Sequence, residues 1–142
     1  MQNSIKVGVG LYILSADNKL LLGLRKSKHG TGTWSPSGGK LEFGEEFEDA
    51  AIRETKEETS LDIKKQDITI AAVTSDIHEQ ENEHVITIHT VTKKYSGELK
   101  LMEPDKFEKW EWFSLQNLPE NLFLPVAKFI KENGLDKFIK PS

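Results

Sequence analysis

The sequence of 142 residues contains no cysteine, which excludes disulfides, thiolate metal sites and a thiol nucleophile. It also has no apolar run that approaches the ~18 residues needed to cross a membrane as a helix. Positive charge is not in excess, because 19 Lys and Arg are outnumbered by 23 Asp and Glu, for a net charge of −4. No sequence-wide basic field therefore attracts nucleic acid. These absences predict a cytoplasmic protein that binds neither a membrane nor a nucleic-acid polymer.

The composition predicts one domain that spans residues 1–142. An apolar fraction of 37% and a charged fraction of 30% are typical of a globular protein of this length with a substantial core. The chain shows no repeats, no low-complexity run and no linker between domains. The apolar VGVGLYIL segment near the start alternates small and large residues and has only Lys6 ahead of it, so we interpret it as a strand and not as a signal peptide.

Alternating and β-branched segments predict strands, and two segments with helical periodicity predict helices. A short extended segment starts at Trp34 and is broken by Pro36. The predicted strands are 4–14, 20–25, 67–77, 83–95 and 107–113, and the predicted helices follow Glu45 and span about Leu124 to Asn133. Strands around a central helix, with another helix at the end, predict an α/β fold in which a mixed β-sheet is sandwiched between helices.

The segment from Gly39 to Leu61 is the most informative, because acidic residues occupy helix positions that are expected to be apolar. At about 100° per residue, one stripe of this helix starts with apolar residues and ends with Glu54 and Glu58, with Glu57 at its edge. An inward carboxylate is costly unless it is paired or binds a cation. Because three of them repel one another, the segment predicts a divalent metal site.

The chemistry of this site depends on its ligands. Carboxylate oxygens suit Mg²⁺, with Mn²⁺ as an alternative, and such an ion takes further ligands from substrate phosphates. Arg53 is placed to hold the carboxylates by charge-assisted hydrogen bonds. The Gly38-Gly39 pair lets the backbone approach closely, so that a carbonyl can join the metal shell, and Lys40 is a nearby cation for phosphate.

Two other groups of residues have competing interpretations. Arg25, with the following Lys26, Lys28 and His29, is either part of a solvated loop or a phosphate-binding loop. Trp110 and Trp112 are expected to pack in the core, and the competing interpretation is that they stack on a nucleotide base. The histidines at 78, 84 and 89 do not predict zinc, because 84 and 89 point to opposite faces of a strand.

The residues around the acidic stripe resemble the signature of the Nudix (MutT-like) hydrolases. That signature has a glycine, a glutamate, an Arg-Glu pair and a Glu-Glu pair at fixed spacing, and seven of its nine specified positions match here. The matching residues are Gly39, Glu45, Arg53, Glu54, Glu57, Glu58 and Leu61. The preceding W-x-P-x-G-G segment and the later WEWFSLQNLP segment extend the resemblance over nearly the whole chain.

Three positions depart from that family pattern. Thr55 replaces an aliphatic residue, Ser60 replaces a glycine, and Ser37 stands where the family commonly has proline before Gly-Gly. Ser60 must therefore form the turn after the helix without the freedom of glycine at positive φ. None of the departures removes a carboxylate, so they affect loop geometry more than catalysis.

The resemblance implies roles for single residues. Glu54, Glu57 and Glu58 would coordinate Mg²⁺, with the Gly38 carbonyl as an addition. Arg53 would orient the residues of the motif, and Glu45 would form hydrogen bonds to other residues of the motif. The base that activates the attacking water would be Glu54 or one of two residues outside the motif, Glu103 and Glu108.

The resemblance is strongest to the small MutT-type nucleoside triphosphate diphosphatases, including the oxidised-purine and thiopurine nucleotide hydrolases. It implies that a nucleoside triphosphate is hydrolysed to the monophosphate and pyrophosphate and that the protein is a homodimer. It also implies that Thr87 and the Phe123–Val126 segment, with Leu124 and Val126 as binding residues, line the base pocket. Two alternatives stay open. The substrate can be another nucleoside diphosphate derivative, such as a nucleotide sugar, a dinucleotide or ADP-ribose, or the chain can be a non-catalytic nucleotide-binding module.

Overall fold

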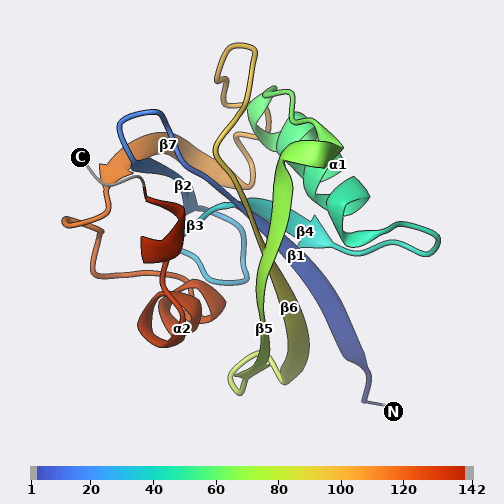
Figure 1. The fold of residues 1–142 in the computed structure, drawn as a ribbon. Coiled ribbons are helices and arrows are strands. Elements are labelled where there is room, and N and C mark those ends of the chain that lie inside the picture. Colours follow the sequence, from blue (N-terminus) through green and yellow to red (C-terminus); the bar gives the residue numbers. More distant parts are fainter. Residues whose placement is uncertain (1–2, 140–142) are drawn as a thin grey trace.

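The computed structural model describes residues 3–139 and contains every strand and both helices predicted above (Figure 1). The largest difference is at the end of β6, which stops at Thr92 and not at residue 95. In chain order the elements are β1 (Ile5–Ile13), β2 (Lys19–Arg25), β3 (Trp34–Ser35), β4 (Ser37–Lys40), α1 (Phe47–Thr59), η1 (Lys65–Asp67), β5 (Ile68–His78), β6 (Glu83–Thr92), β7 (Phe107–Ser114), α2 (Leu124–Glu132) and η2 (Asp136–Phe138).

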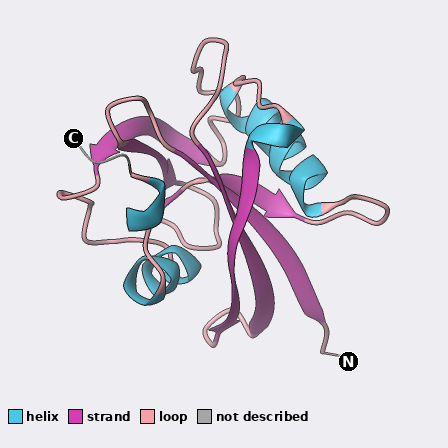
Figure 2. Ribbon diagram, viewed as in Figure 1, coloured by secondary structure: helices cyan, strands magenta, loops and turns pink. Residues whose placement is uncertain are grey.

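The strands form two sheets, whereas the sequence predicted one (Figure 2). The larger sheet is mixed and has the order β4-β1-β6-β5, with β1 parallel to β6. The smaller sheet is antiparallel and has the order β3-β2-β7. Pro36 stands between β3 and β4, and because proline has no backbone N–H, it divides this extended segment between the two sheets.

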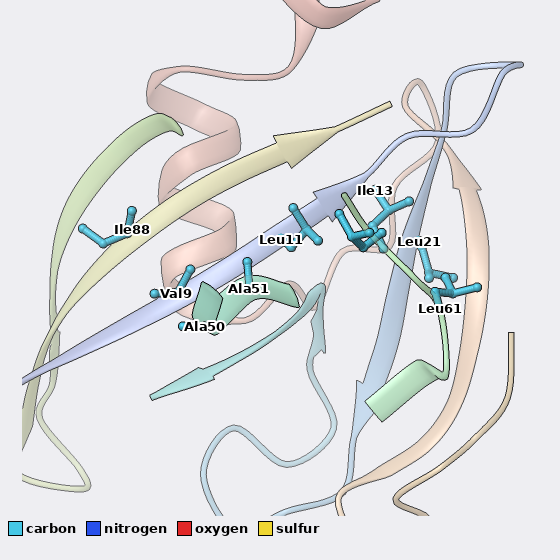
Figure 3. Packing of buried hydrophobic residues seen from close by; sticks show 9 residues of the cluster. Val9, Leu11, Ile13, Leu21, Ala50, Ala51, Leu61 and Ile88 are labelled. Atoms are coloured by element: carbon cyan, nitrogen blue, oxygen red, sulfur yellow. The ribbon is translucent and has the colours of Figure 1, made fainter. Parts of the chain in front are cut away.

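The two helices lie on opposite sides of the larger sheet, so the predicted α/β sandwich is confirmed (Figure 1). On one side Ala50 and Ala51 of α1 are fully buried against Val9 and Leu11 of β1 (Figure 3). These small side chains let the helix approach the sheet closely. On the other side Phe129 of α2 is fully buried against residues of β1 and β6.

The face of the larger sheet that α2 covers is partly bare. The even-numbered residues of β1 point to this face, and two of them are Gly8 and Gly10. Because glycine has no side chain, the sheet leaves space here between itself and α2. Both glycines line the cavity described below.

The ends of α1 are fixed by local interactions. A capping box joins Glu46 and Asp49 at the start, where acidic residues also suit the helix dipole. At the other end Ser60 adopts a left-handed conformation with φ of 70°, which glycine would adopt more easily. The expectation that a serine forms this turn at positive φ is therefore confirmed.

Candidate active site

A cavity of about 460 Å³ joins the carboxylates of α1 to a group of aromatic side chains. Glu54 and Glu58 line it together with the backbone of Gly38 and Gly39. His29, His78 and Phe123 line another part, and Arg25, Lys40 and Lys106 add positive charge to its wall. One space thus holds carboxylates, cations and aromatic rings, which is what a metal-bound nucleotide requires.

Glu58 is held at the buried side of the carboxylate group. It is 3% exposed, and its Oε1 accepts a hydrogen bond from the backbone N–H of Gly38 at 3.0 Å. Burial raises the pKa of Glu58 well above its usual value, and the neighbouring charges of Glu54 and Glu103 raise it further. Burial also raises the pKa of Glu54. A nearby cation would offset the cost of ionising both groups.

Glycine is required where β4 passes the carboxylates. A Cβ at Gly39 would lie 2.4 Å from the carboxyl carbon of Glu54, and a Cβ at Gly38 would lie 2.2 Å from the carbonyl oxygen of Val9. Any side chain at either position would therefore displace the strand or the carboxylate. The Gly-Gly pair serves the close backbone approach that the sequence suggested.

Arg53 ties the carboxylates to the loop before the helix. Its guanidinium donates two hydrogen bonds to Glu45, at 2.7 and 2.9 Å, and one to Oε1 of Glu54 at 2.7 Å. A further bond reaches the carbonyl oxygen of Lys40 at 3.2 Å. The bonds from Arg53 lower the pKa of Glu45 to about 2. This forked arrangement fixes the orientation of Glu54, and lysine could not reproduce it.

Glu57 lies at the rim of the carboxylate group. Its side chain is 48% exposed, and its Oε1 is 3.5 Å from Nη1 of Arg53. It is absent from the residues that line the cavity within the described part of the chain. This placement agrees with the edge of the helical stripe, and the role of Glu57 as a metal ligand stays a prediction.

Of the two candidate bases outside the motif, Glu103 lies beside the carboxylates. The chain before it is bound to the end of α1, since the N–H of Met102 donates to the carbonyl oxygen of Glu58 at 3.3 Å. Oε1 of Glu103 is buried and has no hydrogen-bond partner within residues 3–139. Glu108, on β7, is exposed. Lys106, which was not predicted from the sequence, is 3.6 Å from Glu103 and also interacts with Glu58.

The donor set fits a hard divalent cation. Glu54 and Glu58 place carboxylate oxygens in a largely buried region, and Glu103, whose Oε1 is unpartnered within the described residues, adds a further negative charge beside them. Oxygen donors of this type suit Mg²⁺ and Mn²⁺. Buried charges of one sign are stable only with a compensating charge, so the residues present fit the predicted ion.

Four of the five predicted substrate-binding residues lie in the cavity wall, and one lies outside it. Arg25, Lys40, Thr87 and Val126 all line the cavity. Leu124 is 46% exposed and does not, because the helix begins there with its side chain turned outward. The neighbouring Phe123 and Pro125 line the wall instead of Leu124. Their binding roles stay predictions.

Arg25 connects the two parts of the cavity. Its guanidinium carbon lies 4.0 Å from the centroid of the Phe123 ring, and Nη1 donates to Oγ of Ser35 at 3.1 Å. Its charge also interacts with Glu58. A phosphate bound near the carboxylates would thus meet a cation that is already held in position, and the phosphate-binding role of Arg25 stays a prediction.

A hydrogen-bonded chain of buried polar residues supports the cavity wall. The hydroxyl of Tyr12 lies 3.0 Å from Nδ1 of His89, Nε2 of His89 lies 2.8 Å from Oγ1 of Thr74, and Thr74 donates to Asp76 at 2.8 Å. Burial lowers the pKa of His89 to about 4, so the ring is neutral at pH 7. Since Thr74 donates to Asp76, Nε2 of His89 carries the proton and Nδ1 accepts from Tyr12.

Comparison with known proteins adds independent information. Residues 4–132 match the NUDIX domain family. The chain is 38% identical over 120 residues to an ADP-ribose pyrophosphatase of Methanocaldococcus jannaschii, covering 84% of this chain and 68% of that protein. It is 27% identical over 134 residues to a NAD-capped RNA hydrolase NudC of Pseudomonas putida, and there it spans 45% of the relative's length.

Solved structures have the same fold. A MutT NUDIX hydrolase from Burkholderia pseudomallei superposes with a TM-score of 0.84 at 29% identity, covering 92% of this chain and 98% of that one. A MutT protein from Methanosarcina mazei Go1 gives a TM-score of 0.80 at 23% identity, covering 99% of both chains, which bears on the fold alone. Within residues 3–139 no helix is both long and apolar enough to cross a membrane.

Proposed function

This chain belongs to the NUDIX (MutT-like) hydrolase family, and from that premise we propose that it hydrolyses a pyrophosphate linkage of a nucleotide in a Mg²⁺-dependent reaction. The observation that carries the proposal is the single cavity that connects buried carboxylates, through the cation Arg25, to the aromatic residue Phe123. A nucleotide has matching groups in the same order: phosphates that bind a metal ion and cations, and a flat base that packs against an aromatic ring.

The proposed metal ligands are Glu54, Glu57 and Glu58, with the carbonyl of Gly38 as a further ligand. When bound, Mg²⁺ or Mn²⁺ would supply Lewis-acid polarisation of a phosphoryl oxygen and neutralise the leaving group. Arg53 holds Glu54 in place through its forked hydrogen bonds. Pre-set carboxylates avoid reorganisation at the moment of reaction.

The remaining charged residues would bind phosphate and move the proton. Arg25, Lys40 and Lys106 line the cavity and balance the negative charge of a polyphosphate. Glu103 would take the proton from the attacking water, because its Oε1 is free within the described residues, whereas Oε1 of Glu54 already accepts from Arg53. A base must have an available oxygen within reach of the water.

A nucleoside triphosphate is the first candidate substrate, with the monophosphate and pyrophosphate as products. The similarity to a MutT NUDIX hydrolase over 98% of that chain supports this choice. An oxidised or otherwise modified purine nucleotide falls within the same class. Thr87, Val126 and Phe123 would form the base-binding wall.

A nucleoside diphosphate derivative is the second candidate. The specific observation in its favour is the 38% identity to a protein named ADP-ribose pyrophosphatase. The linkage between the two phosphates of ADP-ribose is chemically the same as the one in a triphosphate, so the carboxylate site suits either substrate. The two classes differ in the group attached to the second phosphate, which is a further phosphate in one and a sugar in the other.

A product assay separates the candidates. The protein is incubated with purine and pyrimidine triphosphates, oxidised dGTP, ADP-ribose, a nucleotide sugar and a dinucleotide, with and without Mg²⁺. Release of pyrophosphate from a triphosphate supports the first candidate, and release of AMP and ribose phosphate from ADP-ribose supports the second. Binding without turnover of any compound would favour the non-catalytic module and contradict the proposal.

The single domain over residues 1–142, the homodimer and the cytoplasmic location stay proposals. Limited proteolysis tests the domain, because a linker would be cleaved first. Light scattering at several concentrations tests the dimer. Fractionation of the host cell tests the location.

A further inference from the structure

Two histidines of the cavity wall come together with a glutamate, and the proposed hydrolysis uses none of the three. The loop after β2 contributes His29, the end of β5 contributes His78, and the turn before β6 contributes Glu81. One ligand atom from each lies within 4.8 Å of the others. The ring centroids of the two histidines are 4.4 Å apart at an interplanar angle of 65°, and Oε1 of Glu81 is 3.6 Å from Nδ1 of His29.

The imidazole nitrogens at this place lack partners. Nδ1 of His29 and Nε2 of His78 are both buried, and neither has a hydrogen bond to any residue between 3 and 139. His78 as a whole is only 7% exposed. Buried polar nitrogens without a partner are unfavourable and rare in folded proteins. A ligand shared by the two rings would satisfy both nitrogens.

The two rings are held near each other by the surrounding structure. The carbonyl oxygen of His29 accepts a hydrogen bond from Nε of Arg25 at 3.0 Å. The next residue, Gly30, has φ of 73°, and a Cβ there would lie 2.6 Å from the Phe123 ring. Phe123 also stacks on His78 with a centroid distance of 5.6 Å. The geometry exists before any ligand binds, which lowers the entropic cost of binding.

We propose that His29, His78 and Glu81 bind a divalent transition-metal ion, with Zn²⁺ and Co²⁺ as the best fits, at a site separate from the carboxylate group. Two imidazoles and one carboxylate form a donor set that borderline metals prefer and that Mg²⁺ does not. Such a set leaves a fourth position for water or for a ligand atom.

The charges around the cluster support this assignment. Oε1 of Glu81 lies 3.6 Å from Nδ1 of His29, so a carboxylate stands beside the imidazoles. Glu83 is also near, with Oε2 3.8 Å from Nδ1 of His29, but its Oε1 is bound to Lys6 at 2.6 Å. Glu81 has no comparable partner within the described residues and is the available carboxylate.

Cobalt absorption tests the site directly. The full chain is titrated with Co²⁺ in excess Mg²⁺, which occupies the carboxylate group first. We expect one equivalent to give the intense visible bands of four- or five-coordinate Co²⁺, and Zn²⁺ to remove them. His29→Gln and His78→Gln are expected to abolish the bands, and Glu81→Gln to weaken Co²⁺ binding by at least the ~10–100-fold that loss of an outer-shell partner costs.

His84→Gln is the matched control. This residue lies on β6, bonds to Oγ of Ser75 at 2.7 Å and points to the opposite face of the sheet, so the bands should persist. A spectrum that the His29 and His78 variants leave unchanged, or that Glu58→Gln alone removes, would overturn the proposal.

A second measurement needs no variant. In ¹H–¹⁵N spectra of the imidazole rings, one equivalent of Zn²⁺ should shift the ring nitrogens of His29 and His78 and leave those of His84 and His89 in place. Unshifted His29 and His78 signals at one equivalent would contradict the site. Both tests measure binding alone, so their outcome does not depend on whether the chain hydrolyses nucleotides.

Discussion

The hydroxyl oxygens of Ser37 and Thr55 lie 2.7 Å apart between β4 and α1, and both residues are almost fully buried. These are two of the three positions at which the chain departs from the Nudix pattern. The two departures therefore compensate each other, because each hydroxyl supplies the buried partner that the other requires. The contact also joins the glycine-containing strand to the helix that carries the carboxylates.

A double-mutant cycle at this pair should show strong coupling. Thr55→Val and Ser37→Ala should each lower the free energy of unfolding by about 1–3 kcal/mol, because each leaves one buried hydroxyl without its partner. The double variant should lose less than the sum, with a coupling of about 0.5–3 kcal/mol. Urea unfolding measures all four proteins. Additive losses would mean that the hydroxyls do not depend on each other.

Glu58→Gln should remove turnover and preserve the fold. The amide oxygen can still accept the hydrogen bond from Gly38, but a neutral group cannot replace an anionic metal ligand. We expect the rate to fall by more than the ~100-fold that loss of an outer-shell partner can cost. Lys56→Gln is the control, since Lys56 is exposed and, among the described residues, pairs with Asp62 and a backbone oxygen outside the site. Near-normal turnover in Glu58→Gln would show that Glu58 is not a metal ligand.

The metal-free protein should lose stability as pH rises, through Glu54 and Glu58. Their pKa values are raised in the folded state, so their contribution is fully present below the unfolded value of 4.5 and is lost as pH rises through the folded values. His89, whose pKa is lowered to about 4, has the opposite effect on stability, because its destabilising contribution grows as pH falls below 6.5. The difference between the wild type and Glu58→Gln isolates the carboxylate effect.

Thermal unfolding between pH 5 and pH 9 measures this difference. In the absence of Mg²⁺ the advantage of Glu58→Gln over the wild type should grow with pH. Added Mg²⁺ should stabilise the wild type and have little effect on the variant, because a ligand that binds only the folded state raises its stability. Parallel pH curves for the two proteins would show that Glu58 ionises as easily in the folded state as in the unfolded state.

The sequence predicted those features of the site that depend on local periodicity. The inward direction of Glu54 and Glu58 follows from helical phase, and the edge position of Glu57 follows from the same phase. The left-handed turn at Ser60 follows from its place after the helix. Each of these requires knowledge of one element only.

Features that join distant segments were not predictable in this way. His29 and His78 belong to a loop and to a strand end far apart in the sequence, and no periodic pattern relates them. The division into two sheets depends on which strands pair with β2, and the pairing with β7 is equally nonlocal. The outward direction of Leu124 depends on the packing of the first turn of α2 against the sheet.

Arg53→Lys should reduce turnover while the positive charge is retained. Lysine cannot make the two parallel bonds to Glu45 and the third to Glu54, so Glu54 would lose its fixed orientation. We expect kcat to fall by about 10–100-fold, with KM for the nucleotide little changed. Steady-state kinetics at saturating Mg²⁺ give both values. A rise in KM alone would mean that Arg53 contacts the substrate and does not position the carboxylate.

Glu103→Gln distinguishes the candidate bases. If Glu103 accepts the proton of the attacking water, activity of the wild type should rise toward alkaline pH as the base ionises. In the variant kcat should fall by about 10²–10⁴-fold and that rise should disappear. Glu108→Gln should be silent, because Glu108 is exposed on β7. The pH dependence separates a base from a residue that only shapes the site, since a structural defect lowers kcat equally at every pH. A variant that keeps the alkaline rise would exclude Glu103 and leave Glu54 as the base.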